Sequence, residues 1–219
     1  MNMIIHDDGH TNVISTDSLK DFSEIKQIHK DFQPNSFDLI LTNPPFAGEI
    51  HERPILNEYE LAKNEKGKLR NKTERHILFI ERALNLIKPG GRLAIVLPQG
   101  VLNNTNMAYI RSWLFDKARI LAVVGLHVNT FKPHTGTKTS VLFLQKWGER
   151  EKLPKDYPIF MAVSKKSGKD NSGDYVFKKD ENGEVAVDAK GNSLLDYDLD
   201  EIADKFIDFA KKEGFKFWR

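Results

Sequence analysis

The tetrapeptide Asn43-Pro44-Pro45-Phe46 carries the groups of this chain that are best suited to chemistry. Each proline fixes φ at about −65° and lacks an N–H, and a residue before proline is driven to extended geometry. The side-chain oxygen of Asn43 and the main-chain oxygen of Pro44 therefore stay available, and both can accept hydrogen bonds from one planar NH2 group. Phe46 can lie flat against the ring that bears this group. The tetrapeptide predicts a binding site for a planar aromatic amine.

The element before the tetrapeptide decides whether it is a site or an ordinary turn. Asn-Pro and Pro-Pro are also common turn dipeptides. Residues 37–42, however, form a nearly continuous apolar run, which is typical of a strand buried on both faces of a sheet. The tetrapeptide follows at the carboxyl end of this strand, where open α/β sheets bind their ligands. This placement favours a functional site.

The surrounding sequence alternates strand and helix patterns, which predicts an α/β fold with a parallel sheet and helices on both faces. Residues 1–5 resemble the end of a helix. Strands are expected at 11–15, 37–42, 93–97, 120–126 and 139–145. Helices are expected at 17–30, 73–88 and 105–118, and Pro89-Gly90-Gly91 ends the second of them.

The sequence changes character after Trp147, which predicts a main unit over residues 1–148 and an extension over residues 149–219. In the extension, a Gly, Ser and Lys stretch at 164–174 predicts a flexible surface loop that contains Lys165, Lys166 and Lys169.

Two regular elements are expected in the rest of the extension. The first is a hairpin at 175–188 around Asn182-Gly183, a dipeptide that favours tight hairpin turns. The second is a helix at 199–213, with Asp198 as its cap and Gly214 as its stop. Together they predict a small hairpin and helix addition to the sheet.

Composition excludes several kinds of chemistry. The chain has 219 residues, of which 40% are hydrophobic and 29% charged, and it contains no apolar run near the length of a membrane span. The absence of cysteine excludes disulfides, thiolate zinc sites and cysteine nucleophiles, which agrees with a cytoplasmic protein that has no membrane partner. A net charge of +2 requires any nucleic-acid contact to be local. No metal site is expected from the spacing of His6, Asp7, Asp8 and His10.

The ordered set of motifs resembles adenine-N6 DNA methyltransferases, and above all the modification (M) subunit of type I restriction-modification systems. The resemblance is close over residues 1–148 and loose beyond them. It rests on the apolar run with Asn-Pro-Pro-Phe, and on the segments at 1–10, 17–19, 75–84, 86–98 and 137–144. Each segment is weak alone, whereas their order is specific.

The resemblance implies roles for six residues. Asn43, Pro44, Pro45 and Phe46 match the catalytic motif, in which Asn43 and Pro45 also lie at the cofactor. Asp17 matches the acidic residue that hydrogen-bonds the adenine of S-adenosylmethionine, although its position also suits a helix N-cap. Phe46 and Phe131 match the aromatic residues that stack on the two faces of an extruded target adenine, although an isolated Phe is more often part of a core.

The implied fold is an incomplete S-adenosylmethionine-dependent methyltransferase sheet of Rossmann type. None of the glycines forms the glycine-rich turn that normally holds the methyl donor, so an N-terminal part of the fold is expected upstream of Met1. The implied partners are DNA, a specificity (S) subunit and a restriction (R) subunit, and a second M subunit is left open.

The missing glycine-rich turn leads to a prediction about the cofactor. The isolated 219-residue chain is expected to bind S-adenosylmethionine poorly or not at all, because the backbone that approaches the donor is absent. Calorimetric titration measures this directly. Micromolar binding by these 219 residues would contradict it.

One segment and two other functions stay open at this point. Residues 47–72 are polar and irregular, and are either a solvated loop or a mobile DNA-contacting lid that is disordered without DNA. A basic cluster of this segment, which continues to Arg75, consists of Lys63, Lys66, Lys68, Arg70 and Lys72, and the acidic residues are Glu49, Glu52, Glu58, Glu60 and Glu65. Asn-Pro-Pro-aromatic motifs also occur in methyltransferases that act on ribosomal RNA guanine or protein glutamine. A non-catalytic remnant or subunit-interaction module is the remaining alternative.

Overall fold

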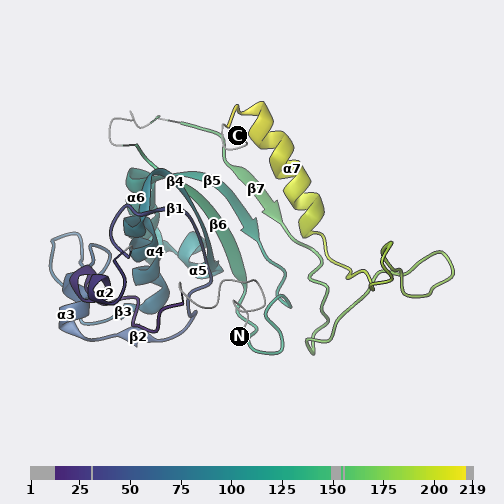
Figure 1. Cartoon of the computed structure of the whole chain (residues 1–219), viewed down its shortest axis with the longest axis horizontal. Coiled ribbons are helices and arrows are strands. Elements are labelled where there is room, and N and C mark those ends of the chain that lie inside the picture. Colours follow the sequence, from purple (N-terminus) through teal and green to yellow (C-terminus); the bar gives the residue numbers. More distant parts are fainter. Residues whose placement is uncertain (1–12, 31, 149–153, 155, 216–219) are drawn as a thin grey trace.

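A five-stranded mixed sheet organises the part of the chain that the computed structural model describes, residues 13–30, 32–148, 154 and 156–215 (Figure 1). The order across the sheet is β1-β4-β6-β5-β7. Its strands are β1 (Phe37–Thr42), β4 (Ile87–Pro98), β5 (Ala118–Gly125), β6 (Thr139–Lys146) and β7 (Phe160–Val163).

One strand of the sheet runs against the other four. β1 is parallel to β4, and β5 is parallel to β7, whereas β6 is antiparallel to both of its neighbours, β4 and β5. The predicted parallel sheet is confirmed for most of the strands, and β6 is the exception, because it follows β5 without the crossover helix that a parallel pair requires. The carboxyl ends of the other four strands share one edge of the sheet.

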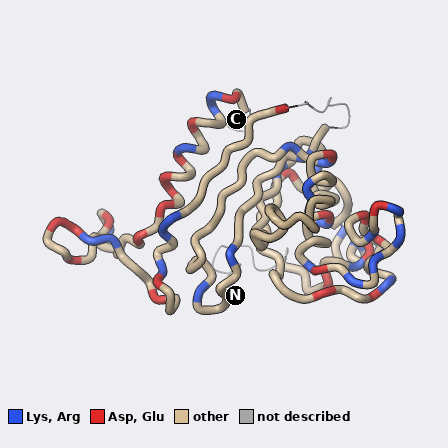
Figure 2. Tube along the Cα trace, turned by 180° about the vertical axis from the view of Figure 1, so that it is seen from behind, with Lys and Arg blue, Asp and Glu red and all other residues tan. Residues whose placement is uncertain are grey.

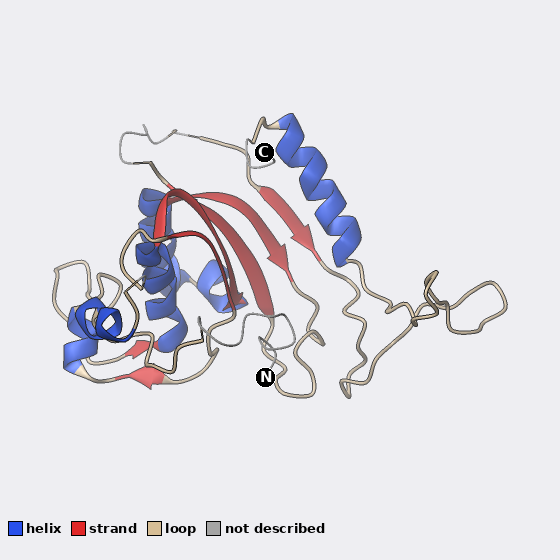
Figure 3. Ribbon diagram, in the orientation of Figure 1, coloured by secondary structure: helices blue, strands red, loops and turns tan. Residues whose placement is uncertain are grey.

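Three helices cover one face of the sheet: α4 (Arg75–Leu86), α5 (Gln99–Asn103) and α6 (Ala108–Lys117) (Figure 3). They pack on the inward side chains of β4 and β6, among which Leu93, Ile95 and Leu144 are fully or almost fully buried. The 3-10 turn η1 (Thr105–Met107) precedes α6, so the expected helix at 105–118 starts later than predicted. The short helix α5 was not expected.

The opposite face is covered by α7 (Leu199–Lys212), which agrees with the predicted last helix and confirms helices on both faces (Figure 1). Phe206 of α7 packs on Phe143 of β6 and Phe160 of β7. Acidic and basic residues both occur along this helix (Figure 2). Within the described residues, no helix has the length and apolar character needed to cross a membrane.

Strand β1 is more exposed than its apolar sequence predicts. Leu39 and Leu41 are 50% and 72% exposed, although the run was expected to be buried on both faces. The reason is that β1 lies at an edge of the sheet, whereas the rings of α7 pack on β6 and β7.

Residues 47–72 are packed, so the expectation of an irregular polar segment is wrong. β2 (Glu49–Ile50) pairs with β3 (Thr73–Glu74), and this pair closes an excursion that contains α3 (Arg53–Asn57). Leu56, Tyr59 and Ala62 are at most 1% exposed and form a small core with Leu78 of α4. A few well-spaced apolar residues therefore fix a segment that is polar on average.

The start of the described chain also differs from expectation. The helix expected at 17–30 is shorter, α2 (Phe22–Ile28), and its cap is Asp21, whose carboxylate accepts the Ser23 N–H at 2.6 Å. Residues 13–15 do not form a strand. The rest of that expected strand, the helix end at 1–5 and the His6 to His10 stretch lie outside the described residues.

Between β7 and α7 the chain forms a long arm, residues 164–198, that reaches away from the sheet (Figure 1). The predicted hairpin is confirmed around Asn182-Gly183, where Lys179 pairs with Val185, and a second turn follows at 188–192. The lysine cluster is not a free loop, because Lys166 pairs with Asp196 at 2.9 Å. The division of the chain between residues 148 and 149 stays a prediction. From the extension, β7 is a strand of the five-stranded sheet and α7 packs on that sheet.

Candidate active site

The tetrapeptide Asn43–Phe46 directly follows the carboxyl end of β1, and a hydrogen bond to helix α4 fixes the chain just after it. Asn43 and Pro45 are exposed, Pro44 is buried and Phe46 is half-buried. Two residues later Gly48 turns the chain with a φ of 98°, and its carbonyl accepts the N–H of Arg75 at 3.0 Å. Since Arg75 is the first residue of α4, the helix fixes where the tetrapeptide ends.

Phe131 lies at the same edge of the sheet, in the loop 126–138 between β5 and β6. Its ring contacts that of Phe46, with 5.2 Å between centroids and 79° between planes. The structure thus brings together two of the aromatic positions predicted from the sequence. The contact is edge to face, and a base stacked on both rings needs them about 7 Å apart, since each stacking contact takes about 3.5 Å. One of the two rings therefore has to turn or move.

Local hydrogen bonds shape the loop that carries Phe131. Phe131 O accepts the N–H of Thr135 at 3.1 Å, and Asn129 O accepts the N–H of Lys132 at 3.0 Å. The hydroxyl of Thr130 donates to the carbonyl of His127 at 2.8 Å. The loop is consequently a series of tight turns.

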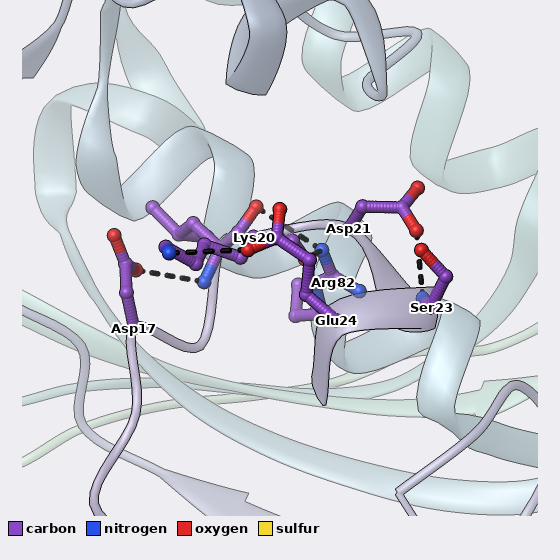
Figure 4. Close-up of polar contacts among 7 residues, drawn as sticks. Asp17, Lys20, Asp21, Ser23, Glu24 and Arg82 are labelled. Carbon is purple, nitrogen blue, oxygen red and sulfur yellow. Dashed lines mark hydrogen bonds and ion pairs between the residues drawn. The ribbon is translucent and has the colours of Figure 1, made fainter. Parts of the chain in front are cut away.

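Asp17 lies in a turn that precedes α2 (Figure 4). Its Oδ1 accepts the N–H of Leu19 at 3.0 Å, and its carbonyl accepts the N–H of Lys20 at 3.3 Å. The helix-cap alternative for Asp17 is wrong, because Asp21 caps α2. The exposed Asp17 carboxylate can accept a further hydrogen bond from a ligand.

A buried arginine from α4 holds this turn, and the sequence pattern did not identify it. Arg82 is 4% exposed, and its Nη2 donates to the carbonyls of Leu19, at 3.1 Å, and Lys20 (Figure 4). Its guanidinium also lies 4.0 Å from the ring centroid of Phe22, which begins α2. The sequence did contain a signal for it: the charged residues Glu81 and Arg82 interrupt the apolar pattern of α4, which indicates buried charge.

Glu81, the neighbour of Arg82, and the buried Tyr59 also connect α4 to the segments that pack on it. Glu81 is 3% exposed, and its two carboxylate oxygens accept the N–H groups of Glu60 and Leu61, each at 2.9 Å, while burial raises its pKa. Burial also raises the pKa of Tyr59 to about 12, so its hydroxyl stays protonated and donates to Leu19 O at 2.8 Å. Helix α4 thereby fastens both the 47–72 segment and the turn of Asp17.

The basic residues of the 47–72 segment are spread over different environments. Lys72 pairs with Glu49 at 2.9 Å, and Arg70 lies over the ring of Tyr109. Residues 64–68 at the tip are exposed, as are Asn71 and Lys72. Among the described residues, no group of His, Asp and Glu side chains is arranged to hold a metal ion.

Comparisons with known sequences identify related proteins. Residues 1–218 match the sequence profile of the N-6 DNA methylase family. The methylase subunit of the type I restriction enzyme MpnII of Mycoplasma pneumoniae is 29% identical over 224 residues, which cover 99% of this chain and 36% of that protein. The methylase subunit of the type I restriction enzyme EcoEI of Escherichia coli is 32% identical over 110 residues, covering 50% of this chain and 21% of that protein.

A comparison with solved structures gives the same fold. The methyltransferase subunit of a type I restriction-modification system from Streptococcus thermophilus is similar with a TM-score of 0.57 and 24% identity, over 94% of this chain and 38% of that one. This chain therefore spans less than two fifths of the length of each of these three proteins.

Proposed function

Because this chain belongs to the N-6 DNA methylase family, we propose that it supplies the target-base side of an adenine-N6 DNA methyltransferase, within the modification subunit of a type I restriction-modification enzyme. One observation carries the proposal. The tetrapeptide Asn43–Phe46 sits at the carboxyl end of β1, and Phe46 is in ring contact with Phe131 at the same edge of the sheet. The acceptors for an amino group and two aromatic rings are thus assembled in one place.

The proposed chemistry follows from these groups. A paired adenine has its N6 amino group inside the duplex, so the base has to be extruded, at a cost of a few kcal/mol. Phe46 and Phe131 offset part of this cost by stacking. The side-chain oxygen of Asn43 and the carbonyl of Pro44 accept the two N–H groups, which favours a more tetrahedral and more nucleophilic nitrogen. Transfer would be direct, without a covalent protein intermediate: the N6–methyl bond would form as the sulfur–methyl bond of the donor breaks, the demethylated donor would leave, and N6 would lose one proton to solvent.

S-adenosylmethionine is the proposed methyl donor, and it supplies an electrophilic methyl group when bound. The residues present fit part of its site. Asp17 offers an exposed carboxylate on a turn fixed by Arg82, which suits an amino group of an adenine ring. Asn43 and Pro45 are exposed at the end of β1 and are proposed to line the donor side.

The proposed partners are DNA, a specificity subunit and a restriction subunit, and a second modification subunit is compatible with the same assembly. The net charge of +2 makes sequence recognition by a partner subunit more reasonable than recognition by this chain alone. The exposed tip at residues 64–68 carries Lys66 and Lys68 and is proposed as a local DNA contact.

Deletion of the gene in the cells that encode it tests the proposed function. Long-read sequencing of their genomic DNA is expected to show N6-methyladenine at one sequence motif, and this methylation is expected to vanish on deletion and return with a plasmid copy. Mass spectrometry of ribosomal RNA and release factors from the same cells is the control for substrate class. Loss of guanine or glutamine methylation would assign the alternative substrates. No change in any substrate would indicate a non-catalytic remnant or subunit-interaction module.

A further inference from the structure

The root of the arm touches the loop that carries Phe131. The ammonium of Lys169 donates to the carbonyl of Lys132 at 2.8 Å. In return Asn129, which is 5% exposed, donates from its side-chain amide to the carbonyl of Lys169 at 3.3 Å. These reciprocal bonds join the arm to the loop on both sides of Phe131.

A close backbone approach reinforces the contact. Gly173 has a φ of 101°, and a Cβ built on it would lie 2.6 Å from Pro133 N and 2.8 Å from Lys132 C. Any side chain at this position has to push the arm and the loop apart. Gly173 belongs to the turn 170–174, in which Asp170 Oδ1 accepts the N–H groups of Gly173 and Asp174 at 2.9 and 3.0 Å. The turn is therefore a firm support for the loop.

The loop needs such a support because the contact between Phe46 and Phe131 has to open to make room for a base. With 5.2 Å between the centroids of Phe46 and Phe131, the rings must separate by about 2 Å or turn before a base stacks on both. If the backbone of the loop were free to shift, the ring would lose its position when the contact opened. A fixed backbone lets the side chain turn while the stacking distance is kept.

We propose that the turn 170–174 and Lys169 position Phe131 for stacking on the target base. This inference rests on the proposed function. It makes Lys169 and Gly173 positioning residues that act through the loop 126–138, and it gives the arm a role in base extrusion. The contact joins residues that lie about 40 positions apart in the chain, as in the pair Asn129 and Lys169.

The arm provides a matched control for the experiment. The turn 180–184 repeats the turn 170–174, since Asp180 Oδ1 accepts the N–H of Glu184 at 2.9 Å and Gly183 has a φ of 84°. A Cβ on Gly183, however, meets no atom within 4 Å. Gly173→Ala and Gly183→Ala therefore introduce similar backbone strain, and only the first disturbs the Phe131 loop.

Hydrogen exchange of the chain gives the first measurement. Gly173→Ala is expected to speed exchange of the Lys132 and Thr135 amides about tenfold or more, because a shift of the loop weakens their hydrogen bonds, whereas Gly183→Ala leaves them unchanged. Lys169→Met is the second variant, with Lys178→Met as its control, should Gly173→Ala disrupt the arm as a whole. If the Lys132 and Thr135 amides exchanged at the same rate in each variant and its control, the arm would not support the Phe131 loop.

Methylation by the tagged complex, purified from the cells that encode it, gives the second measurement. On its native duplex target, Gly173→Ala is expected to lower kcat about tenfold with an unchanged KM for S-adenosylmethionine, since a small displacement of a stacking group is costly. The deficit is expected to shrink when the target adenine lies opposite a mismatch, because extrusion then costs less. A kcat equal to that of Gly183→Ala would overturn the proposal. A wild-type complex that methylates no DNA would instead overturn the proposed function, and hydrogen exchange would separate the two cases.

Discussion

Replacing Asn43 by alanine is expected to slow methyl transfer about 100-fold or more, because one of the two acceptors that act on the amino group is lost. Asn43 is exposed at the end of β1, so the fold and the melting temperature are expected to stay unchanged. Single-turnover methylation of duplex DNA by the complex from the native cells measures the rate, and calorimetry measures the melting.

Two further variants sharpen this prediction. Asn43→Asp keeps an acceptor oxygen and is expected to retain more activity than Asn43→Ala. Asn182→Ala removes an equally exposed amide from the tip of the arm and is expected to leave the rate unchanged. Undiminished methylation by Asn43→Ala would defeat the assignment of the tetrapeptide.

Arg82→Met is expected to lower the free energy of unfolding by about 3 kcal/mol, because the buried carbonyl of Leu19 and the partly buried carbonyl of Lys20 lose a charged donor. For a chain of this size the melting temperature should fall by roughly 6–12 °C. Urea and thermal denaturation of the 219-residue chain measure both quantities. Hydrogen exchange should also show faster opening of the Leu19 amide, which is bonded to Asp17.

An exposed cation serves as the control for Arg82. Lys88 pairs with Asp38 at 3.0 Å on the surface, and Lys88→Met is expected to change the unfolding free energy by less than about 0.5 kcal/mol. Arg82→Lys keeps the charge but loses the planar fork that reaches two carbonyls, so an intermediate loss is expected. If Arg82→Met and Lys88→Met changed the free energy of unfolding equally, Arg82 would not stabilise the turn that contains Asp17.

Local sequence patterns predicted β1 and β6 well because each is a short apolar run, whereas β7 (Phe160–Val163) was not predicted and β4 begins at Ile87, six residues before the predicted strand at 93–97. The run at 37–42 coincides with β1, and that at 139–145 almost coincides with β6. The direction of β6 and the exposure of Leu41 depended on neighbours in space, which periodicity does not contain. The segment 47–72 was misjudged because its average polarity concealed the spacing of Leu56 and Tyr59.

The candidate site was predictable where topology alone assembles it. Asn43–Phe46 and Phe131 follow strands whose carboxyl ends lie on the same side of the sheet, which made their proximity predictable, although β4 and β6 lie between the two strands and only the folded loop 126–138 brings the rings into contact. Arg82 reaches back 63 positions to Leu19, and Lys169 reaches back 37 positions to Lys132. The charged pair Glu81-Arg82 in the apolar pattern of α4 was a local signal of buried charge, but the contact partners of Arg82 and Lys169 are not contained in local spacing, and only the folded chain identifies them.

Helix α4 sets the distance between the tetrapeptide Asn43–Phe46 and the turn that contains Asp17. Its first residue, Arg75, is bonded to Gly48 beside the tetrapeptide, and Arg82, two turns later, is bonded to the turn of Asp17. Seven residues of helix correspond to about 10 Å along the axis. Thermal motion of this helix therefore carries both parts together and preserves their spacing. A single residue inserted between Arg75 and Arg82 would rotate one end by about 100° and break that registration.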